Sequence, residues 1–448
     1  MNKNESFEIQ IEDIDINGNG VGKVDGFTFF VSGALPGETV RARAAKLNKS
    51  YGFARTEEIL VPSLQRRAPP CRYYQKCGGC TLQHLSYAAQ LEWKTNHVTS
   101  CLSRIGGISA PVSFTLPSRS EFRYRNKAAF PLGMDGLLKI GFYSARSHDL
   151  LDIDDCPIQN KDVALLISQL RTWVAHNRVS VYDEKTGRGL LRHAVVRTAK
   201  SGDMMLTLCI NGEDVPFHDE LAASFRYVLP RLKSISLSVN KQKNNTILGS
   251  RAITIYGSDH ITEQILGLDF NIGPHTFLQV NGASTETLYN VLFKMLDLKK
   301  SETVVDLYCG AGAITLPAVQ HAGFAYGIEI VPEAVGDARR NAKLNGIDNV
   351  EFIAGDVAEK LAEVLGKAAP DAIILDPPRK GVEESVIKAC AASGAKRIGY
   401  VSCNPSTLAR DLKKFASLGY TVAAVQPVDM FPQTTHVETV VLLNLQNF

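Results

Sequence analysis

Cys403 lies in the segment YVSCNPSTLAR (400–410), where a predicted strand ends and a predicted helix begins at Pro405. A thiol beside the N-terminus of a helix loses its proton more readily, because the helix dipole stabilises the thiolate. A cysteine in a strand is more often a small buried hydrophobic residue than a reactive one. The position at the end of a strand favours the reactive interpretation, so Cys403 is the candidate nucleophile.

A thiolate has a specific use in the methylation of a pyrimidine. Carbon 5 of the ring is a poor nucleophile, but addition of a thiolate at carbon 6 turns the ring into an enolate whose carbon 5 can attack a methyl group. A base must then remove the proton from carbon 5. Glu438, preceded by His436 in VDMFPQTTHVETVV (428–441), is the candidate base. Either side chain is also compatible with an ordinary solvated position.

The segment DLYCGAGAITL (306–316) predicts a cofactor site. Gly310 and Gly312 allow a tight turn and the close approach of a ligand to the start of the next helix, although a helix start alone can require glycine. Glu329 ends the following predicted strand, where a carboxylate can accept hydrogen bonds from ribose hydroxyls. Thr315 stands where a pyrophosphate-binding motif has its third glycine, so the pattern favours S-adenosylmethionine over NAD.

Asp376 begins the segment DPPRKG (376–381), directly after another predicted strand. A carboxylate followed by two rigid prolines indicates the wall of a substrate pocket, and the alternative is a turn capped by aspartate. An aromatic residue after the prolines would favour methylation of an amino group. Arg379 stands there instead, which disfavours that reaction.

Three cysteines occur within ten residues, Cys71, Cys77 and Cys80, and Cys156 offers a fourth ligand. No signal peptide or membrane span is recognisable, so we expect a cytoplasmic protein with reduced thiols, in which a disulfide framework is disfavoured. Four thiolates suit either a zinc ion or an iron–sulfur cluster. The spacing alone leaves both open.

The chain must supply elements that position these residues. Residues 6–60 alternate apolar and polar positions between Gly, Asn and Pro turns, which predicts a small β-barrel. Strand-like runs from about 114 to 280, with one helix over 161–177, predict a mixed α+β region. In the remainder, short apolar strands alternate with helices, which predicts a parallel sheet covered on both faces. Ligands of such sheets bind beyond the carboxyl ends of the strands, where Asp376 and Cys403 stand.

Composition sets wider limits. The 448 residues suffice for about three domains of ordinary size. A formal net charge of +3 is too small to indicate a nucleic-acid binder by itself, but basic residues cluster at 41–55 and 122–127. These clusters are compatible with contacts to phosphates.

The segments DPPRKG, YVSCNPST and VDMFPQTTHVE, in this order after DLYCGAG, resemble the RNA (uracil-5-)-methyltransferase family, and the resemblance covers almost the whole chain. It implies that Cys403 is the nucleophile and Glu438 the base. FLQVN (277–281) resembles the family segment that precedes the cofactor domain. By this resemblance, S-adenosylmethionine is bound by Gln279, Tyr308, Glu329 and Asp376.

The N-terminal segments GNGVGK, FVSGALPGETVRAR and YGFARTEEILVPS resemble the TRAM domain, an RNA-binding, OB-like β-barrel. The chain is therefore most similar to bacterial 23S ribosomal RNA (uracil-5-)-methyltransferases, which carry a TRAM domain and a 4Fe-4S cluster. The resemblance assigns the cluster to Cys71, Cys77, Cys80 and Cys156. It implies three domains: a TRAM-like barrel at 1–62, a central α+β domain with the Cys-rich segment at 63–285, and a Rossmann-like α/β methyltransferase domain at 286–448.

The expected function is S-adenosylmethionine-dependent methylation of carbon 5 of a specific uridine in 23S ribosomal RNA. The alternatives are the same reaction on transfer RNA and a non-catalytic RNA-binding protein, against which the presence of both Cys403 and Glu438 argues. We expect a single-stranded or loop uridine as the target, because the ring must leave its stack to meet a thiolate. We also expect a monomer without a membrane partner.

Overall fold

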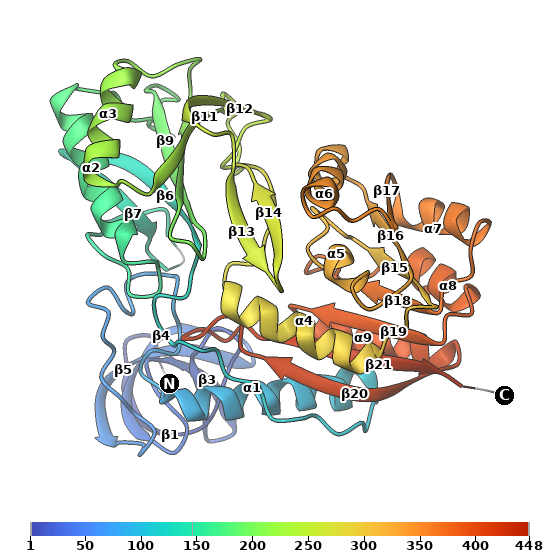
Figure 1. Ribbon diagram of the computed structural model, residues 1–448. Coiled ribbons are helices and arrows are strands. Elements are labelled where there is room, and N and C mark those ends of the chain that lie inside the picture. Colours follow the sequence, from blue (N-terminus) through green and yellow to red (C-terminus); the bar gives the residue numbers. More distant parts are fainter. Residues whose placement is uncertain (1, 146, 447–448) are drawn as a thin grey trace.

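The computed structural model describes residues 2–145 and 147–446, which form a small barrel and two large sheets (Figure 1). The barrel is closed, with the strand order β1-β2-β3-β5-β4. Along β4, Val40, Ala42 and Ala44 are buried, because successive side chains of a strand point to opposite faces. The strands of the barrel are β1 (Ser6–Ile14), β2 (Gly20–Val24), β3 (Phe27–Ser32), β4 (Thr39–Leu47) and β5 (Tyr51–Val61).

A seven-stranded sheet with the order β12-β11-β10-β9-β6-β7-β8 forms the central region. Helices α2 (Asp162–His176) and α3 (His218–Val228) pack on one face of it and share its apolar core. The predicted helix over 161–177 is confirmed. The strands are β6 (Lys127–Asp135), β7 (Leu137–Tyr143), β8 (Leu150–Asp152), β9 (Leu191–Thr198), β10 (Met204–Ile210), β11 (Leu232–Val239) and β12 (Arg251–Gly257).

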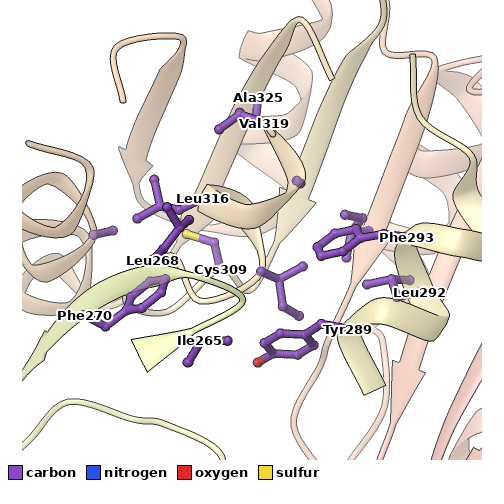
Figure 2. Close-up of a cluster of buried hydrophobic side chains, with 14 of the residues drawn as sticks. Ile265, Leu268, Phe270, Tyr289, Leu292, Phe293, Cys309, Leu316, Val319 and Ala325 are labelled. Carbon is purple, nitrogen blue, oxygen red and sulfur yellow. The ribbon is translucent and has the colours of Figure 1, made fainter. Parts of the chain in front are cut away.

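A hairpin and a helix lead from the central sheet to the last part of the chain. The hairpin consists of β13 (Ile261–Ile265) and β14 (Leu268–Ile272), and helix α4 (Gly282–Leu296) follows it. Figure 2 shows Phe270 from the hairpin and Tyr289 from α4 in the same buried cluster as the residues after β15. The hairpin and α4 are therefore packed against the region predicted to hold the cofactor.

The third part is the predicted α/β sheet, with the order β17-β16-β15-β18-β19-β21-β20. Its first five strands in this order are parallel, and β21 runs antiparallel between β19 and β20. The strands are β15 (Thr303–Leu307), β16 (Phe324–Glu329), β17 (Val350–Ala354), β18 (Ala372–Leu375), β19 (Arg397–Ser402), β20 (Tyr420–Val428) and β21 (Glu438–Leu445). The helices are α5 (Thr315–Ala318), α6 (Pro332–Leu344), α7 (Val357–Leu365), α8 (Glu384–Ala392) and α9 (Pro405–Ser417).

Helix α1 (Tyr87–Cys101) and the π-helical turn η1 (Leu102–Gly106) come early in the chain but pack on the C-terminal sheet. Val98, Cys101 and Leu102 share an apolar core with Leu412 and Phe415 of α9. The N-terminal part of the chain thus reaches across to the C-terminal sheet. The three predicted domain boundaries stay a prediction.

The predicted three-part architecture is confirmed in outline. After β15, the helix α5 is short, and the chain continues as turns. No helix in the described part of the chain is long and apolar enough to cross a membrane.

Candidate active site

The candidate residues meet at one edge of the C-terminal sheet, where the parallel strands end. Leu307 of β15 pairs with Leu375 of β18, and Leu375 pairs with Tyr400 of β19, so these strands end almost level with one another. β16 lies on the other side of β15. The residues at the ends of these strands are Tyr308, Glu329, Asp376 and Cys403.

Cys403 and Glu438 come together on neighbouring strands of opposite direction. Ser402 of β19 pairs with Thr439 of β21. Cys403 follows Ser402 and Glu438 precedes Thr439, so the thiol and the carboxyl stand at the same end of the strand pair. Their electrostatic interaction raises the pKa of the Cys403 thiol. The structure therefore brings the predicted nucleophile and the predicted base into one site.

The environment of Cys403 favours the thiol over the thiolate. Burial raises its pKa to about 11, Glu438 and Asp376 add to the rise, and Arg379 opposes it. Helix α9 does begin beside this residue, with Asn404 as its N-cap. Burial and the two carboxyl groups act against the ionisation that the helix start favours, and the effect of the helix start itself stays a prediction. A neighbouring base or cation must therefore help to remove the proton.

Glu438 and Asp376 both hold protons more tightly than ordinary carboxyl groups. Glu438 is only 2% exposed, and its Oε2 is buried without a hydrogen-bond partner among the described residues. Burial raises its pKa to about 8, with a further contribution from Asp376 and an opposing one from Arg379. Asp376 is partly exposed as a residue, but burial of its carboxyl group raises its pKa to about 7. A group with a pKa near neutrality can serve as a proton acceptor at physiological pH.

The sequence alone did not assign two further residues of this site, Asp306 and Tyr289. Asp306 is fully buried, its Oδ2 accepts a hydrogen bond of 2.5 Å from Thr315 Oγ1, and burial raises its pKa to about 8. Tyr289 is buried in α4 (Figure 2), and the carboxyl groups of Asp376, Asp306 and Glu438 help to raise the pKa of its phenol. For Asp306, the one sequence signal was its position as a charged residue inside an apolar strand, which is rare without a partner. Tyr289 has the spacing of a core residue and gives no signal.

The glycine turn after β15 has the shape expected of a ligand-binding loop. Tyr308, Gly310 and Gly312 have φ angles of 70°, 54° and 83°, in the left-handed region that favours glycine. A Cβ atom on Gly310 would meet nothing within 4 Å, so open space lies above this position. Glu329 borders the turn, because its Oε2 accepts a hydrogen bond of 3.2 Å from the Gly310 N–H.

These observations fit S-adenosylmethionine, whose sulfonium group carries a positive charge. Three carboxyl groups with raised pKa values gather at the edge, and a cation among them would favour their ionised forms. Buried oxygens of Asp306 and Glu438 lack hydrogen-bond partners among the described residues. Gln279, 9% exposed, lies just before α4, and its carbonyl accepts a hydrogen bond from Asn126 Nδ2 of the central region.

The four cysteines of the predicted cluster share one region outside this edge. Cys77 forms an isolated β-bridge with Ser144, next to β7. Burial raises the pKa of Cys80 to about 12 and that of Cys156 to about 11, and the other thiols of the set contribute to both rises. The thiols thus lie near enough to influence one another. Within residues 2–145 and 147–446, however, no three His, Cys, Asp or Glu side chains form a group that could hold a metal ion.

Comparison with known proteins identifies the family. A model described as tRNA (Uracil-5-)-methyltransferase matches residues 86–446, and a TRAM domain model matches residues 2–56. An uncharacterized RNA methyltransferase of Clostridium acetobutylicum is 44% identical over 449 residues, which cover 99% of this chain and 98% of that protein. One of Listeria innocua is also 44% identical, covering 100% of this chain and 99% of that protein.

A solved structure agrees with this match. It is the Pyrococcus abyssi tRNA (uracil-54, C5)-methyltransferase in complex with S-adenosyl-L-homocysteine, with a TM-score of 0.76 and 28% identity. The match covers 98% of this chain and 100% of that chain. The chain therefore belongs to the S-adenosylmethionine-dependent RNA (uracil-5-)-methyltransferase family and carries a TRAM domain at its N-terminus.

Proposed function

We propose that this enzyme methylates carbon 5 of a specific uridine in 23S ribosomal RNA through a covalent adduct between Cys403 and carbon 6. The observation that carries the proposal is the pairing of β19 with β21, which puts Cys403 beside Glu438 at the cofactor edge of the sheet. A methyltransferase that acts on a nitrogen or oxygen atom needs no thiol there. Methylation of a pyrimidine carbon does, because carbon 5 must first be made nucleophilic.

The residues act in a fixed order. The Cys403 thiol gives its proton to a nearby base, and the thiolate forms a bond to carbon 6 of the uracil while the electron pair of the C5–C6 double bond moves toward O4. S-adenosylmethionine supplies the methyl group that carbon 5 takes up. Glu438 then accepts the proton from carbon 5, the C5–H electron pair restores the double bond, and the bond between Cys403 and carbon 6 breaks. Glu438 must be ionised for this step.

The cofactor residues are part of the same proposal. Glu329 stands at the end of β16, where its carboxylate can bind ribose hydroxyls in exchange for its backbone contacts. Tyr308 is only partly buried, so its ring can contact a ligand at the turn. Asp376 and Gln279 would bind at the side that faces the uracil. The low exposure of Gln279 supports a place inside the site.

Ribosomal RNA is the proposed substrate because the chain combines the TRAM barrel with four cysteines that lie near one another. The second candidate is transfer RNA, since the matching Pyrococcus abyssi enzyme is a tRNA methyltransferase. In either RNA we infer a single-stranded or loop uridine. We also propose that the protein is a cytoplasmic monomer with three domains, at 1–62, 63–285 and 286–448.

A 4Fe-4S cluster on Cys71, Cys77, Cys80 and Cys156 is also proposed. A single tetrahedral zinc ion requires four sulfur atoms within about 3.8 Å of one another. A cubane binds one thiolate at each of four iron atoms and therefore tolerates wider spacing. The other thiols help to raise the pKa of Cys80 and of Cys156, which supports a common ligand set, and the resemblance to 23S ribosomal RNA methyltransferases favours the iron–sulfur cluster over one zinc ion. Methyl transfer needs no electrons, so the cluster has a structural role.

Two measurements test the proposed function. In a strain that lacks the protein, mapping of 5-methyluridine should show the loss of a site in 23S ribosomal RNA, whereas a loss confined to transfer RNA would favour the second candidate. With RNA that contains 5-fluorouridine, the wild type should form a denaturant-stable complex, because fluorine cannot leave as a proton. Cys403→Ala should form none. Methyl transfer by Cys403→Ala would refute the covalent route.

A further inference from the structure

Gln433 lies in the loop between β20 and β21, and it is fully buried with a φ angle of 72°. A residue other than glycine in this conformation needs compensating contacts. The backbone supplies three of them: the carbonyl of Gln433 accepts hydrogen bonds of 3.0 Å from the N–H groups of Thr81 and Leu82. Its own N–H donates to Gln90 Oε1 at 3.0 Å.

The side chain of Gln433 is bound as completely as its backbone. Its Oε1 accepts hydrogen bonds from Gln90 Nε2 at 3.1 Å and from Arg67 Nη2 at 2.8 Å, and its Nε2 donates to Glu121 at 3.2 Å. Arg67 and Glu121 form an ion pair of 2.7 Å with each other. Gln433 is therefore held by six side-chain and backbone groups from five residues within 67–121, more than 300 positions earlier in the chain.

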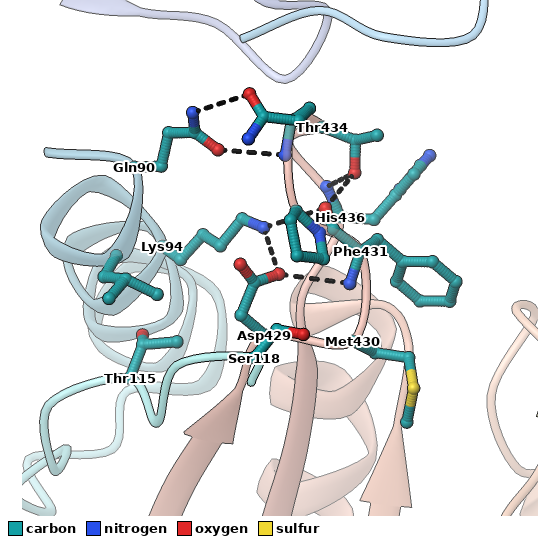
Figure 3. Close-up of polar contacts among 12 residues, drawn as sticks. Gln90, Lys94, Thr115, Ser118, Asp429, Met430, Phe431, Thr434 and His436 are labelled. Carbon is teal, nitrogen blue, oxygen red and sulfur yellow. Dashed lines mark hydrogen bonds and ion pairs between the residues drawn. The ribbon is translucent and has the colours of Figure 1, made fainter. Parts of the chain in front are cut away.

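The neighbours of Gln433 in the loop are also hydrogen-bonded to earlier parts of the chain. Tyr124 Oη donates to the carbonyl of Pro432 at 3.0 Å, and Thr435 Oγ1 donates to the carbonyl of Ile16 in the barrel at 2.7 Å. In Figure 3, Gln90 of α1 faces this loop together with Lys94. The loop then passes His436 and ends at Glu438, the first residue of β21.

We propose that Gln433 is a positioning residue that fixes Glu438 for removal of the carbon 5 proton. This inference rests on the proposed covalent mechanism and deepens it. Cys403 directly follows β19, and Glu438 is paired with Val428 of β20 as the first residue of β21. The chain that enters Glu438 comes from the loop that Gln433 anchors, so a shift of this loop acts first on Glu438. A displaced carboxylate would leave thiolate addition intact. The proton at carbon 5 would leave slowly, and the bond between Cys403 and carbon 6 would persist.

The test uses Gln433→Met in the full chain, because methionine keeps the length of the side chain and removes its hydrogen bonds. In a single turnover, methyl transfer should proceed near the wild-type rate. Release of methylated RNA should slow by about tenfold to a hundredfold, the loss expected for a misplacement of about 1 Å. A denaturant-stable complex of protein and methylated RNA should accumulate, and the dissociation constant for the initial binding of RNA should stay unchanged. A role in folding alone would not produce this complex.

Two companion variants keep the test decisive if Gln433→Met does not fold. Gln90→Met, which leaves the bonds from Thr81 and Leu82 in place, should also accumulate the complex. The double variant should be slowed by less than the product of the two single effects, because the two side chains share one hydrogen bond. The matched control is Gln426→Met, since Gln426 also binds an earlier segment, at the carbonyl of Phe114, but lies outside the loop. It should release product like the wild type.

Release at the wild-type rate by folded Gln433→Met and Gln90→Met would overturn the inference, and so would equal slowing of methyl transfer and release. The proposed function fails by a different result, namely methyl transfer by Cys403→Ala in the same assay. The two failures are therefore distinguishable.

Discussion

The ion pair between Lys94 and Asp429 joins helix α1 to the loop that leads to Glu438, and its removal has a predictable cost. Both side chains are 0% exposed, and Lys94 Nζ lies 2.6 Å from Asp429 Oδ1. Lys94 also donates to the carbonyl of Phe431 at 3.1 Å (Figure 3). We predict that Lys94→Met strongly destabilises the protein.

The magnitude follows from what the substitution leaves behind. Methionine fills nearly the same space, so little packing is lost, but the carboxylate of Asp429 stays buried without a counter-charge. Its Oδ2 already lacks a partner among the described residues, and Oδ1 keeps one hydrogen bond from the Phe431 N–H. Breaking one side of a buried pair costs about 3–5 kcal/mol. At about 2–4 °C per kcal/mol for a unit of this size, the melting temperature should fall by roughly 6–20 °C.

The assay is thermal unfolding of the full chain, followed by calorimetry and circular dichroism. Lys388→Met is the matched control, because Lys388 pairs with Glu384 on the surface, where both side chains are more than half exposed. It should change the melting temperature little. Lys94→Met combined with Asp429→Asn should recover much of the loss, since no unpaired charge remains. If Lys94→Met unfolds at the same temperature as Lys388→Met, the reasoning about this buried pair is refuted.

Three further predictions concern the site and the cysteines. Because the pKa of Glu438 is raised to about 8 and the base must be ionised after methyl transfer, kcat should rise with pH and level off above about pH 8. Arg379→Gln should move this limb to higher pH, and an unmoved limb would contradict the assigned interaction. Protein purified without oxygen should be brown and lose its colour in Cys80→Ala but not in Cys101→Ala, whereas a colourless protein with one zinc ion would exclude the cluster. Folding raises the pKa of Asp306 from 3.8 to about 8, so its protonated form stabilises the fold below about pH 4, and this stabilisation is lost as the pH rises through 8. Asp306→Asn should flatten this pH dependence of the free energy of unfolding, measured by denaturant titrations. An unchanged pH dependence would contradict the assignment.

The position of the site was predictable from the sequence, because it depends on local patterns. Short apolar strands alternating with helices predict a parallel sheet, and the residues that end such strands must share an edge. Asp376 and Cys403 were found in this way. Glu438 needed more than a pattern, since only the antiparallel pairing of β21 with β19 brings it to that edge. The sequence named Glu438 as a candidate base but left a solvated position open, and the family resemblance favoured the base.

The electrostatic state of the site could not be predicted in the same way. The local sequence of Cys403 shows the start of a helix, which lowers the pKa of a thiol, but it does not show the carboxyl groups of Asp376 and Glu438 from neighbouring strands. Burial of the thiol and these two carboxyl groups act in the opposite direction and raise its pKa. A pKa depends on all charges within several ångströms, and most of them come from distant parts of the chain.

Polar residues of α1 illustrate a second limit. Gln90 and Lys94 are four positions apart in YAAQLEWKTNHV, so they share one face of the helix, and their types suggest that this face meets solvent. Both are in fact 0% exposed, because Gln433 and Asp429 supply matching polar groups. A buried polar face cannot be distinguished from a solvated one until its partners are known.

Contacts with α1 and with the loop between β20 and β21 give the N-terminal region a second structural role. The barrel resembles a separate RNA-binding domain, but it also contacts the rest of the chain. The carbonyl of Ile14 accepts a hydrogen bond from Trp93 of α1, and that of Ile16 accepts one from Thr435 in the loop between β20 and β21. The C-terminal sheet holds the proposed nucleophile, and residues from the barrel, the Cys-rich segment and α1 hold the loop that leads to the proposed base. Loss of the barrel would therefore disturb proton removal as well as RNA affinity. A truncated enzyme that binds RNA weakly would have to be assayed at saturating RNA, because only there do the two effects separate.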